Sequence, residues 1–272
     1  MIRLGTFFPF WFFAFLGISS PALAGPIEDC ASQIPYGAPA AITNKPTTVV
    51  CHRAYLVGHD DQLKVPRWVA WVETGPNSMG CHSRPGTNAF KPDPELPKGR
   101  RAEPSDYSSS GYDRGHMASN ADMAWDPDVV RESFLLSNIA PQLHGFNAGI
   151  WEVLERDERI WATDRGEVAI LAGPIFDGAP QTIGPDKVGV PSGFFKVIVD
   201  PKTSDTLAFL FPHEVVKGTD LRPFLTSIGG LEVAAGMTIP VPHTIDRTKT
   251  GELWPADQKA WAAKKTAVCQ TD

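Results

Sequence analysis

The chain has 272 residues, of which 21% are charged, and its formal net charge is −6 at pH 7. A chain of this length can bury a sizeable core, and its acidic balance argues against a broadly basic coat for nucleic acid. A local cluster of lysines and arginines with a bound cation can still reverse the field in one cleft. Weak overall affinity for a polyanion suits an enzyme that must release its products.

The first 24 residues have the three regions of a signal peptide. Arg3 provides the positive start, an apolar run extends from Leu4 to about Ser19, and Ala22-Leu23-Ala24 is a small-residue cleavage site. The alternative is a membrane anchor, but a proline and a glycine interrupt the run, which barely reaches the length of a bilayer. We therefore expect cleavage after residue 24, a single domain over 25–272 without a membrane span, and a periplasmic or secreted location.

Four cysteines lie in the expected mature chain: Cys30, Cys51, Cys81 and Cys269. An even number in an exported protein favours two disulfides, and three pairings are open. One of them, Cys30 with Cys269, would tie the two ends together. A zinc site is the alternative, but no two cysteines are closely spaced in the way that zinc sites usually require.

Segments 48–57 and 67–73 are rich in β-branched and aromatic residues with polar residues between them, which predicts two core strands. Residues 75–111 are rich in proline, glycine and charge and predict a long loop, a feature that usually has a functional reason. The loop carries five basic residues: Arg84, Lys91, Lys98, Arg100 and Arg101. Two interpretations of this segment stay open: a solvated surface loop, and the rim of a substrate-binding site.

The spacing of apolar residues predicts a helix from Asn147 to about Trp161. Its apolar stripe consists of Ile150, Trp151, Val153 and Leu154. Further strands are expected at 168–171, 194–199 and 207–211, and a short helix near 256–265 is expected to end the fold.

Residues Asp113-Arg114-Gly115-His116 place an acid, a guanidinium and an imidazole within four positions. On its own this tetrapeptide could be a surface turn with a solvated histidine. Two further segments follow it, Phe134–Gln142 and Gly145–Trp151, and then Glu155. Together these motifs resemble the DNA/RNA non-specific endonucleases of the ββα-metal superfamily, the endonuclease G-like group. The resemblance covers Trp68–Phe176 closely and fades in the last third of the chain.

The resemblance implies an α+β fold with a central antiparallel sheet and a ββα-metal nuclease motif, in which a strand presents His116 and a helix presents Asn147. It also implies a Mg²⁺-dependent endonuclease, with Mn²⁺ as a substitute, that cleaves DNA and RNA and leaves 5′-phosphate and 3′-hydroxyl ends. Contacts to backbone phosphate would give tolerance of sugar and sequence.

The same residues suit phosphodiester hydrolysis on chemical grounds. The reaction needs a base for water, positive charge for the phosphorane and a proton for the leaving oxygen. His116 can be the general base, because its unperturbed pKa lies near neutrality. Mg²⁺ prefers oxygen and keeps most of its waters, so the amide oxygen of Asn147 is enough to place it. The alternative for Asn147 is a helix N-cap.

Glu155 lies eight positions after Asn147. On one regular helix the two would be roughly 12 Å apart along the axis and about 80° apart in azimuth, which disfavours direct ligation of one ion by both. The resemblance gives Glu155 a contact to the metal through water. A solvent-facing helical glutamate is the alternative.

Arg114 is expected to contact phosphate through bidentate hydrogen bonds. Asp113 and Asn138 are expected to orient His116 and its water, although a structural hydrogen bond in a loop is an alternative for all three residues. Many family members also have an arginine in the upstream loop. The aligned position here is Asn88, so we assign substrate binding to Arg84 in its place.

His144 either contacts substrate or is a satisfied loop histidine, which we favour. No histidine pair has short metal-ligand spacing, and the serine run at 108–110 lacks the glycines of a nucleophile elbow. Two other functions stay open: a catalytically silent nucleic-acid-binding or uptake protein on the same fold, and a metal-dependent phosphodiesterase acting on a smaller substrate. The oligomeric state is open as well, a homodimer included.

Overall fold

The computed structural model describes Met1 and residues 25–41 and 47–270. The expected signal peptide and its cleavage site after Ala24 lie outside these residues. Among the helices that the structure describes, none is both long and apolar enough to cross a membrane.

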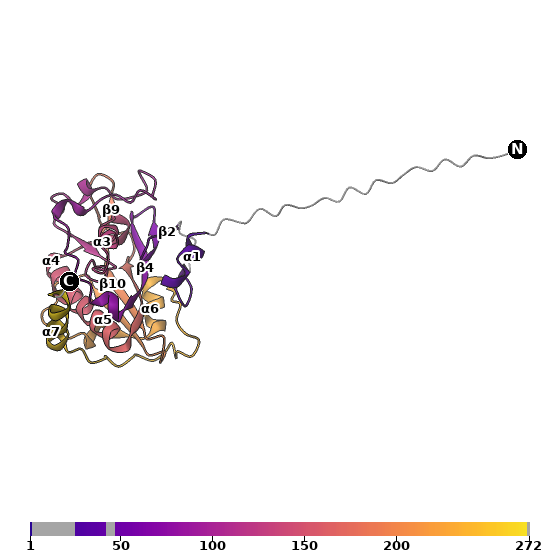
Figure 1. Ribbon diagram of the computed structural model, residues 1–272. Coiled ribbons are helices and arrows are strands. Elements are labelled where there is room, and N and C mark those ends of the chain that lie inside the picture. The colour runs from indigo at the N-terminus through magenta and orange to yellow at the C-terminus, as the bar shows by residue number, and fades with distance from the viewer. Residues whose placement is uncertain (2–24, 42–46, 271–272) are drawn as a thin grey trace.

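A seven-stranded antiparallel sheet forms the centre of the molecule (Figure 1). In spatial order its strands are β12 (Leu225–Thr226), β11 (Thr206–Pro212), β10 (Gly193–Val199), β7 (Glu167–Ile175), β4 (Val65–Thr74), β3 (Leu56–Asp60) and β2 (Thr47–Cys51). Successive residues of β4 point to opposite faces: Val69 and Trp71 join one hydrophobic cluster, and Trp68 and Ala70 join another. The predicted antiparallel sheet is confirmed.

Three two-stranded ladders complete the strands: β1 (Ala40–Ala41) with β13 (Met237–Thr238), β5 (Asp113–His116) with β6 (Ile139–Gln142), and β8 (Thr182–Ile183) with β9 (Val188–Gly189). Short helical turns are η1 (Ala31–Gln33), η2 (Thr87–Ala89), η3 (Pro104–Tyr107), η4 (Leu136–Asn138), η6 (Arg222–Phe224) and the π-helical η5 (Asn147–Trp151).

The α-helices are α1 (Pro26–Asp29), α2 (Gly75–Ser78), α3 (Pro127–Ser133), α4 (His144–Phe146), α5 (Glu152–Arg165), α6 (Ile228–Ala235) and α7 (Gln258–Cys269). On one face of the sheet, the buried rings of Trp71, Trp151 and Trp161 belong to the larger cluster, with Trp161 coming from α5. The other face is covered by Leu231 of α6 and by residues near Cys30 (Figure 1). The larger cluster supports the segments that form the candidate site.

The predicted single strand 48–57 is wrong: these residues form the hairpin β2–β3, in which Val50 pairs with Val57. The turn between the strands is closed by the His52 amide, which donates to the Tyr55 carbonyl at 2.9 Å. Contacts to a distant segment hold it, because the Tyr55 hydroxyl donates to the Glu132 carbonyl at 2.6 Å. No glycine or proline marks this turn in the sequence. The other predicted strands lie within β4, β7, β10 and β11, as expected.

Two disulfides are present, Cys30–Cys51 and Cys81–Cys269, so the predicted number is confirmed. The first joins the N-terminal segment to β2 at the edge of the sheet. The second joins the last helix, α7, to the segment that follows α2. Structural disulfides of this kind indicate a compartment outside the reducing cytoplasm.

Candidate active site

The site is built on a β-β-α unit formed by β5, β6 and the helical segment that follows β6. His116 pairs with Ile139, and Gly115 pairs with Ala140. A Cβ at Gly115 would lie 2.0 Å from the Oε1 and 2.4 Å from the Cγ of the buried Gln142, so the Gln142 side chain fills the space that a larger residue at position 115 would need. A strand thus presents His116, as the sequence predicted.

The predicted regular helix from Asn147 to about Trp161 is only partly correct. Residues 147–151 form a π-helical turn with a kink at Gly149, and α5 follows it. The spacing expected between Asn147 and Glu155 on a regular helix therefore does not apply. Single π-helical turns inside longer helices frequently occur at functional sites.

The side chain of Asn147 bonds another side chain and does not cap a helix. Its Nδ2 donates to Oδ2 of Asp113 at 2.9 Å, while its backbone is itself helical. Its side chain caps none of the described helix ends, so the N-cap alternative is excluded. In the described part of the chain no group bonds its Oδ1, and this amide oxygen is available to a ligand.

Asp113 holds two side chains with one oxygen atom. Its Oδ2 also lies 2.9 Å from Nδ1 of His144, whose side chain is 81% exposed. Asp113 therefore orients Asn147 and His144, whereas the sequence assigned it to His116. His144 therefore lies at the surface, and its Nδ1 is the ring nitrogen that faces Asp113.

His116 is buried, with 8% of its surface exposed, between two aromatic rings. Its ring centroid lies 5.5 Å from that of Phe90 and 4.9 Å from that of Phe134. Its Nε2 has no hydrogen-bond partner among the described residues. Burial, helped by the positive charge of Arg84, lowers the pKa of His116 to about 3. The imidazole is therefore neutral at neutral pH.

An open cleft of about 410 Å³ adjoins this strand. It is lined by Arg84, Phe90, Tyr107, Tyr112, Asp113, Arg114, His144, Asn147 and Ala148. Four residues that the sequence analysis selected thus meet in one place: Arg84, Asp113, Arg114 and Asn147.

The guanidinium of Arg114 is held at the cleft by backbone and rings. Its Nη2 donates to the Pro104 carbonyl at 3.2 Å, and its Cζ lies 5.2 Å from the centre of the Phe90 ring. Arg84 approaches from the opposite segment, with its Cζ 5.5 Å from the centre of the Phe134 ring. Both cations therefore lie next to the rings that enclose His116.

Asn138 is fully buried and bonds backbone, not the His116 ring. Its Oδ1 accepts from the Ala118 amide at 3.0 Å, and its Nδ2 donates to the carbonyls of Ala118 and Ser133 at 2.9 Å each. The carbonyl of His116 accepts from Nε1 of Trp151 at 3.1 Å. These bonds fix the backbone at His116 and just after it.

Glu155 lies on α5, partly exposed, above a cluster of buried charges. Burial raises the pKa of Glu155 to about 7, against the opposing effect of Lys196. Lys196 itself bonds Glu158 at 2.7 Å, and both side chains are fully buried.

Arg159 is a residue that the sequence analysis missed. Its Nη1 donates to Asp122 at 2.8 Å and to the Ser119 hydroxyl at 3.2 Å, in the segment that leaves His116. One signal was available, because Arg159 lies four positions after Glu155 and so shares a face of the helix. The partner Asp122 has no comparable signal in the sequence.

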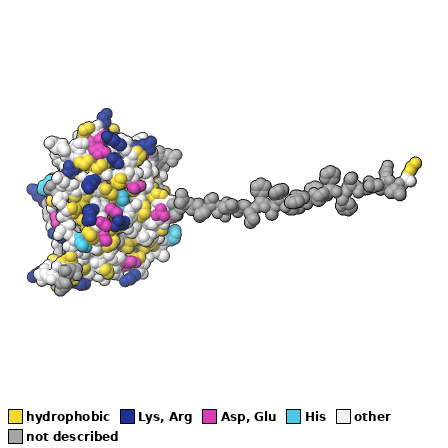
Figure 2. All heavy atoms as spheres, turned by 45° about the horizontal axis from the view of Figure 1, so that its top comes forward, with side chains coloured by type: hydrophobic (Ala, Val, Ile, Leu, Met, Phe, Trp, Pro, Cys, Tyr) yellow, Lys and Arg dark blue, Asp and Glu magenta, His cyan; other side chains and the backbone are white. Residues whose placement is uncertain are grey.

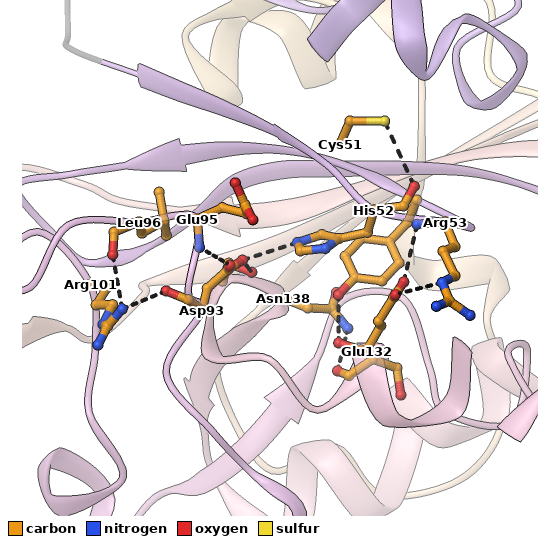
Figure 3. Close-up of polar contacts among 12 residues, drawn as sticks. Cys51, His52, Arg53, Asp93, Glu95, Leu96, Arg101, Glu132 and Asn138 are labelled. Carbon is orange, nitrogen blue, oxygen red and sulfur yellow. Dashed lines mark hydrogen bonds and ion pairs between the residues drawn. The ribbon is translucent and has the colours of Figure 1, made fainter. Parts of the chain in front are cut away.

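The predicted long loop 75–111 is only partly correct, because α2 occupies its start and the turns η2 and η3 lie further along it. The segment is anchored by Asp93, which is fully buried (Figure 3). Asp93 accepts from His52 at 3.0 Å and from the Ser137 hydroxyl. Burial raises the pKa of Asp93, but these hydrogen bonds outweigh it and bring the pKa below its usual range. Arg101 donates to the Asp93 and Leu96 carbonyls, so this basic residue of the loop has a structural role.

The surface viewed in Figure 2 mixes basic with acidic side chains and apolar ones.

The described residues contain no cluster of three or more His, Cys, Asp or Glu side chains that could hold a metal ion. A free amide oxygen beside a carboxylate does not suit zinc, which takes three or four protein ligands. It does suit a hydrated Mg²⁺, which needs few protein ligands.

Comparison with known proteins places these features in a family. The family model for DNA/RNA non-specific endonucleases matches residues 37–243. Human mitochondrial nuclease EXOG is 33% identical over 227 residues, which cover 74% of this chain and 59% of that protein. Mitochondrial endonuclease G from Bos taurus is 28% identical over 242 residues, covering 84% and 77%.

Nuclease C1 from Cunninghamella echinulata var. echinulata is 30% identical over 205 residues, covering 68% of this chain and 79% of that one. A chain from the crystal structure of an EndoG/EndoGI complex superposes with a TM-score of 0.71 at 28% identity, covering 83% of this chain and 95% of the other. The family resemblance and the α+β fold are therefore confirmed. The chain spans 54–59% of the length of the EXOG nucleases from human, zebrafish and mouse.

Proposed function

The chain belongs to the DNA/RNA non-specific endonuclease family, and from this we propose that it hydrolyses phosphodiester bonds of DNA and RNA in the cleft beside β5. One observation carries the proposal. Arg84, Arg114 and the free amide oxygen of Asn147 meet at an open cleft whose adjoining strand carries a neutral, unpaired imidazole, that of His116.

His116 acts as the general base. It takes a proton from the attacking water while the water oxygen bonds phosphorus and the bond to the 3′ oxygen of the sugar breaks. The departing oxygen takes a proton from solvent, which leaves 5′-phosphate and 3′-hydroxyl ends. The bonds that Trp151 and Asn138 make to the backbone keep the ring in place during this transfer.

Arg84 and Arg114 bind the phosphate and stabilise its added negative charge. Asn147 would hold the metal, Mg²⁺ or Mn²⁺, with Asp113 fixing its amide and Glu155 acting through bridging water. When bound there, the cation supplies further positive charge to the phosphorane. Asn138 acts through the backbone at Ala118 and not through the reacting atoms.

The shape of the cleft favours a polymeric substrate over a small phosphodiester. Arg84, His144 and Ala148 are exposed, so the cleft opens to solvent along its rim. Binding through arginines reads backbone phosphate, which predicts tolerance of sugar and base sequence. With two disulfides in the chain, a periplasmic or secreted location suits this activity.

The test incubates the purified protein with supercoiled plasmid and with RNA, in the presence of Mg²⁺, Mn²⁺ or a chelator. We expect cleavage of both substrates with either metal, and its loss with chelator or in His116→Ala. His243→Ala is the matched control, because His243 is exposed and follows Val241, which packs on the opposite face of the sheet. Undiminished cutting by His116→Ala would refute the mechanism, and binding without cutting by the wild type would favour the silent binding protein.

A further inference from the structure

The last helix, α7, lies beyond the segment that the family model matches and beside α5 (Figure 1). None of its residues is buried, so it adds little to the core. Its contacts to α5 are specific instead. Trp261 Nε1 donates to the Thr163 hydroxyl at 3.1 Å, and Gln258 donates to Asp157 at 2.7 Å.

One contact of α7 leads toward His116. The Arg159 guanidinium lies 5.8 Å from the centre of the Trp261 ring and is 6% exposed as a residue. Arg159 in turn donates to Asp122 and Ser119, which follow His116 by six and three positions. The indole of Trp261 therefore covers an arginine that holds the segment leaving the histidine.

A second contact leads toward Arg84. Cys269, at the end of α7, is bonded to Cys81, three positions before Arg84. Beside the disulfide, Lys265 donates to the Ser78 carbonyl at 3.2 Å.

The segment that carries Cys81 also packs against the chain beyond His116. A Cβ at Gly80 would lie 2.2 Å from the backbone of Ala124, and the His82 amide donates to the Ala124 carbonyl at 2.9 Å. The segment that the disulfide ties to α7 therefore packs on the same stretch of chain that Arg159 holds.

We propose that α7 is a positioning clamp for the cleft: the Cys81–Cys269 disulfide fixes the Arg84 segment, and Trp261 fixes Arg159 and the chain behind His116. No residue of α7 lines the cleft in the described structure, so the helix acts on the site through its contacts to other segments and not on the substrate. The proposal rests on the nuclease function proposed above. It predicts that the two contacts affect different kinetic constants.

The first experiment replaces Cys81 and Cys269 with serine. Because Arg84 binds substrate, we expect KM for plasmid to rise several-fold with a smaller change in kcat. The matched control replaces Cys30 and Cys51 with serine, since that disulfide joins the N-terminal segment to the far edge of the sheet. Below its own Tm, measured by circular dichroism, the control should keep the wild-type KM and kcat.

The second experiment compares Trp261→Ala with Trp261→Phe. Loss of the indole should lower kcat about tenfold, since misplacement near the reacting atoms is costly, and should leave KM nearly unchanged. Phenylalanine keeps a ring over Arg159 but loses the bond to Thr163, so it should restore most of kcat. Thr163→Val, which removes the same bond, should match it.

Wild-type KM and kcat in both the folded Cys81→Ser/Cys269→Ser and Trp261→Ala variants would overturn the clamp. A readout independent of catalysis is amide hydrogen exchange over residues 79–84 and 117–126. Faster exchange there in the double serine variant, with unchanged exchange in β7, supports the clamp even if the wild type cleaves nothing. Unchanged exchange in both segments would contradict it, whatever the activity.

Discussion

Asp113 determines how Asn147 is presented, because a single carboxylate oxygen bonds both Asn147 and His144. The sequence placed an acid near the histidine, and the residues Arg84, Arg114 and Asn147, which were selected from the sequence, line one cleft. The sequence could not show which side chain Asp113 would bond. The hydrogen bond joins Asp113 to Asn147, and no local sequence pattern connects these two positions.

The role of this carboxylate can be tested by removing it. Asp113→Ala should raise the Mg²⁺ concentration needed for half-maximal cleavage by about tenfold to a hundredfold. This is roughly the loss of metal affinity seen when a metal ligand loses its orienting partner. Asn147→Ala should abolish the metal response while keeping the fold. Cleavage measured across a Mg²⁺ titration gives both values. A normal metal response in Asn147→Ala would rule out its role as the ligand.

His116 makes stability depend on pH. Its pKa is about 3 in the folded protein and about 6.5 in the unfolded chain, so the unfolded chain takes up the proton first. The stabilisation is complete above pH 6.5 and is lost as the pH falls from 6.5 toward 3. Between pH 7 and pH 5 the loss from this residue is about 2 kcal/mol.

Urea unfolding of the wild type and of His116→Gln at pH 7 and pH 5 measures this contribution. Since glutamine does not titrate, the free energy of unfolding should fall less in the variant, by about 2 kcal/mol. Equal falls in the two proteins would show that the histidine is not held in its neutral form by the fold.

At the scale of elements, β5 and β6 pack together with the buried side chain of Gln142 filling the space beside Gly115. Gly115→Ala would place a methyl group against the buried Gln142. We expect a lower Tm, with a cost of about 1–3 kcal/mol for overpacking, and a larger loss of kcat because β5 also carries His116. Gly86→Ala is the control, since a Cβ there meets nothing within 4 Å. Wild-type kcat in Gly115→Ala would show that the packing of Gln142 against position 115 does not affect the placement of His116.

Elements with strong periodicity were predicted well, and elements set by distant contacts were not. The strands β4, β7, β10 and β11 followed from their β-branched and aromatic runs. The β2–β3 turn was missed because Tyr55 and Glu132, far apart in the sequence, hold it. The π-helical turn at 147–151 was missed because its residues have the apolar spacing of an ordinary helix.

At the scale of the whole molecule, the net charge of −6 and the mixed surface leave a small cationic footprint. Two arginines at the cleft should give a slope of about 2 when log KM is plotted against log salt concentration, at roughly 0.9 for each phosphate contact. Arg84→Ala should lower the slope by about 1. Measurements between 50 and 200 mM salt test this, and a slope much steeper than 2 would require further basic contacts.

The overall architecture was largely predictable because the motif order implied a ββα unit on an antiparallel sheet. The cover of the second face by α6 and the N-terminal segment was not, since short amphipathic stretches carry little signal. The disulfide pairing was equally out of reach, because Cys81 and Cys269 are 188 positions apart and only the folded chain brings α7 beside α2.

The Cys81–Cys269 bond also encloses most of the chain in one covalent ring. Exposed stretches within this ring, such as residues 97–100, are where a protease would cut first. A single cut there leaves the two pieces joined through sulfur. Where thiols are scarce, the molecule can therefore be nicked without coming apart.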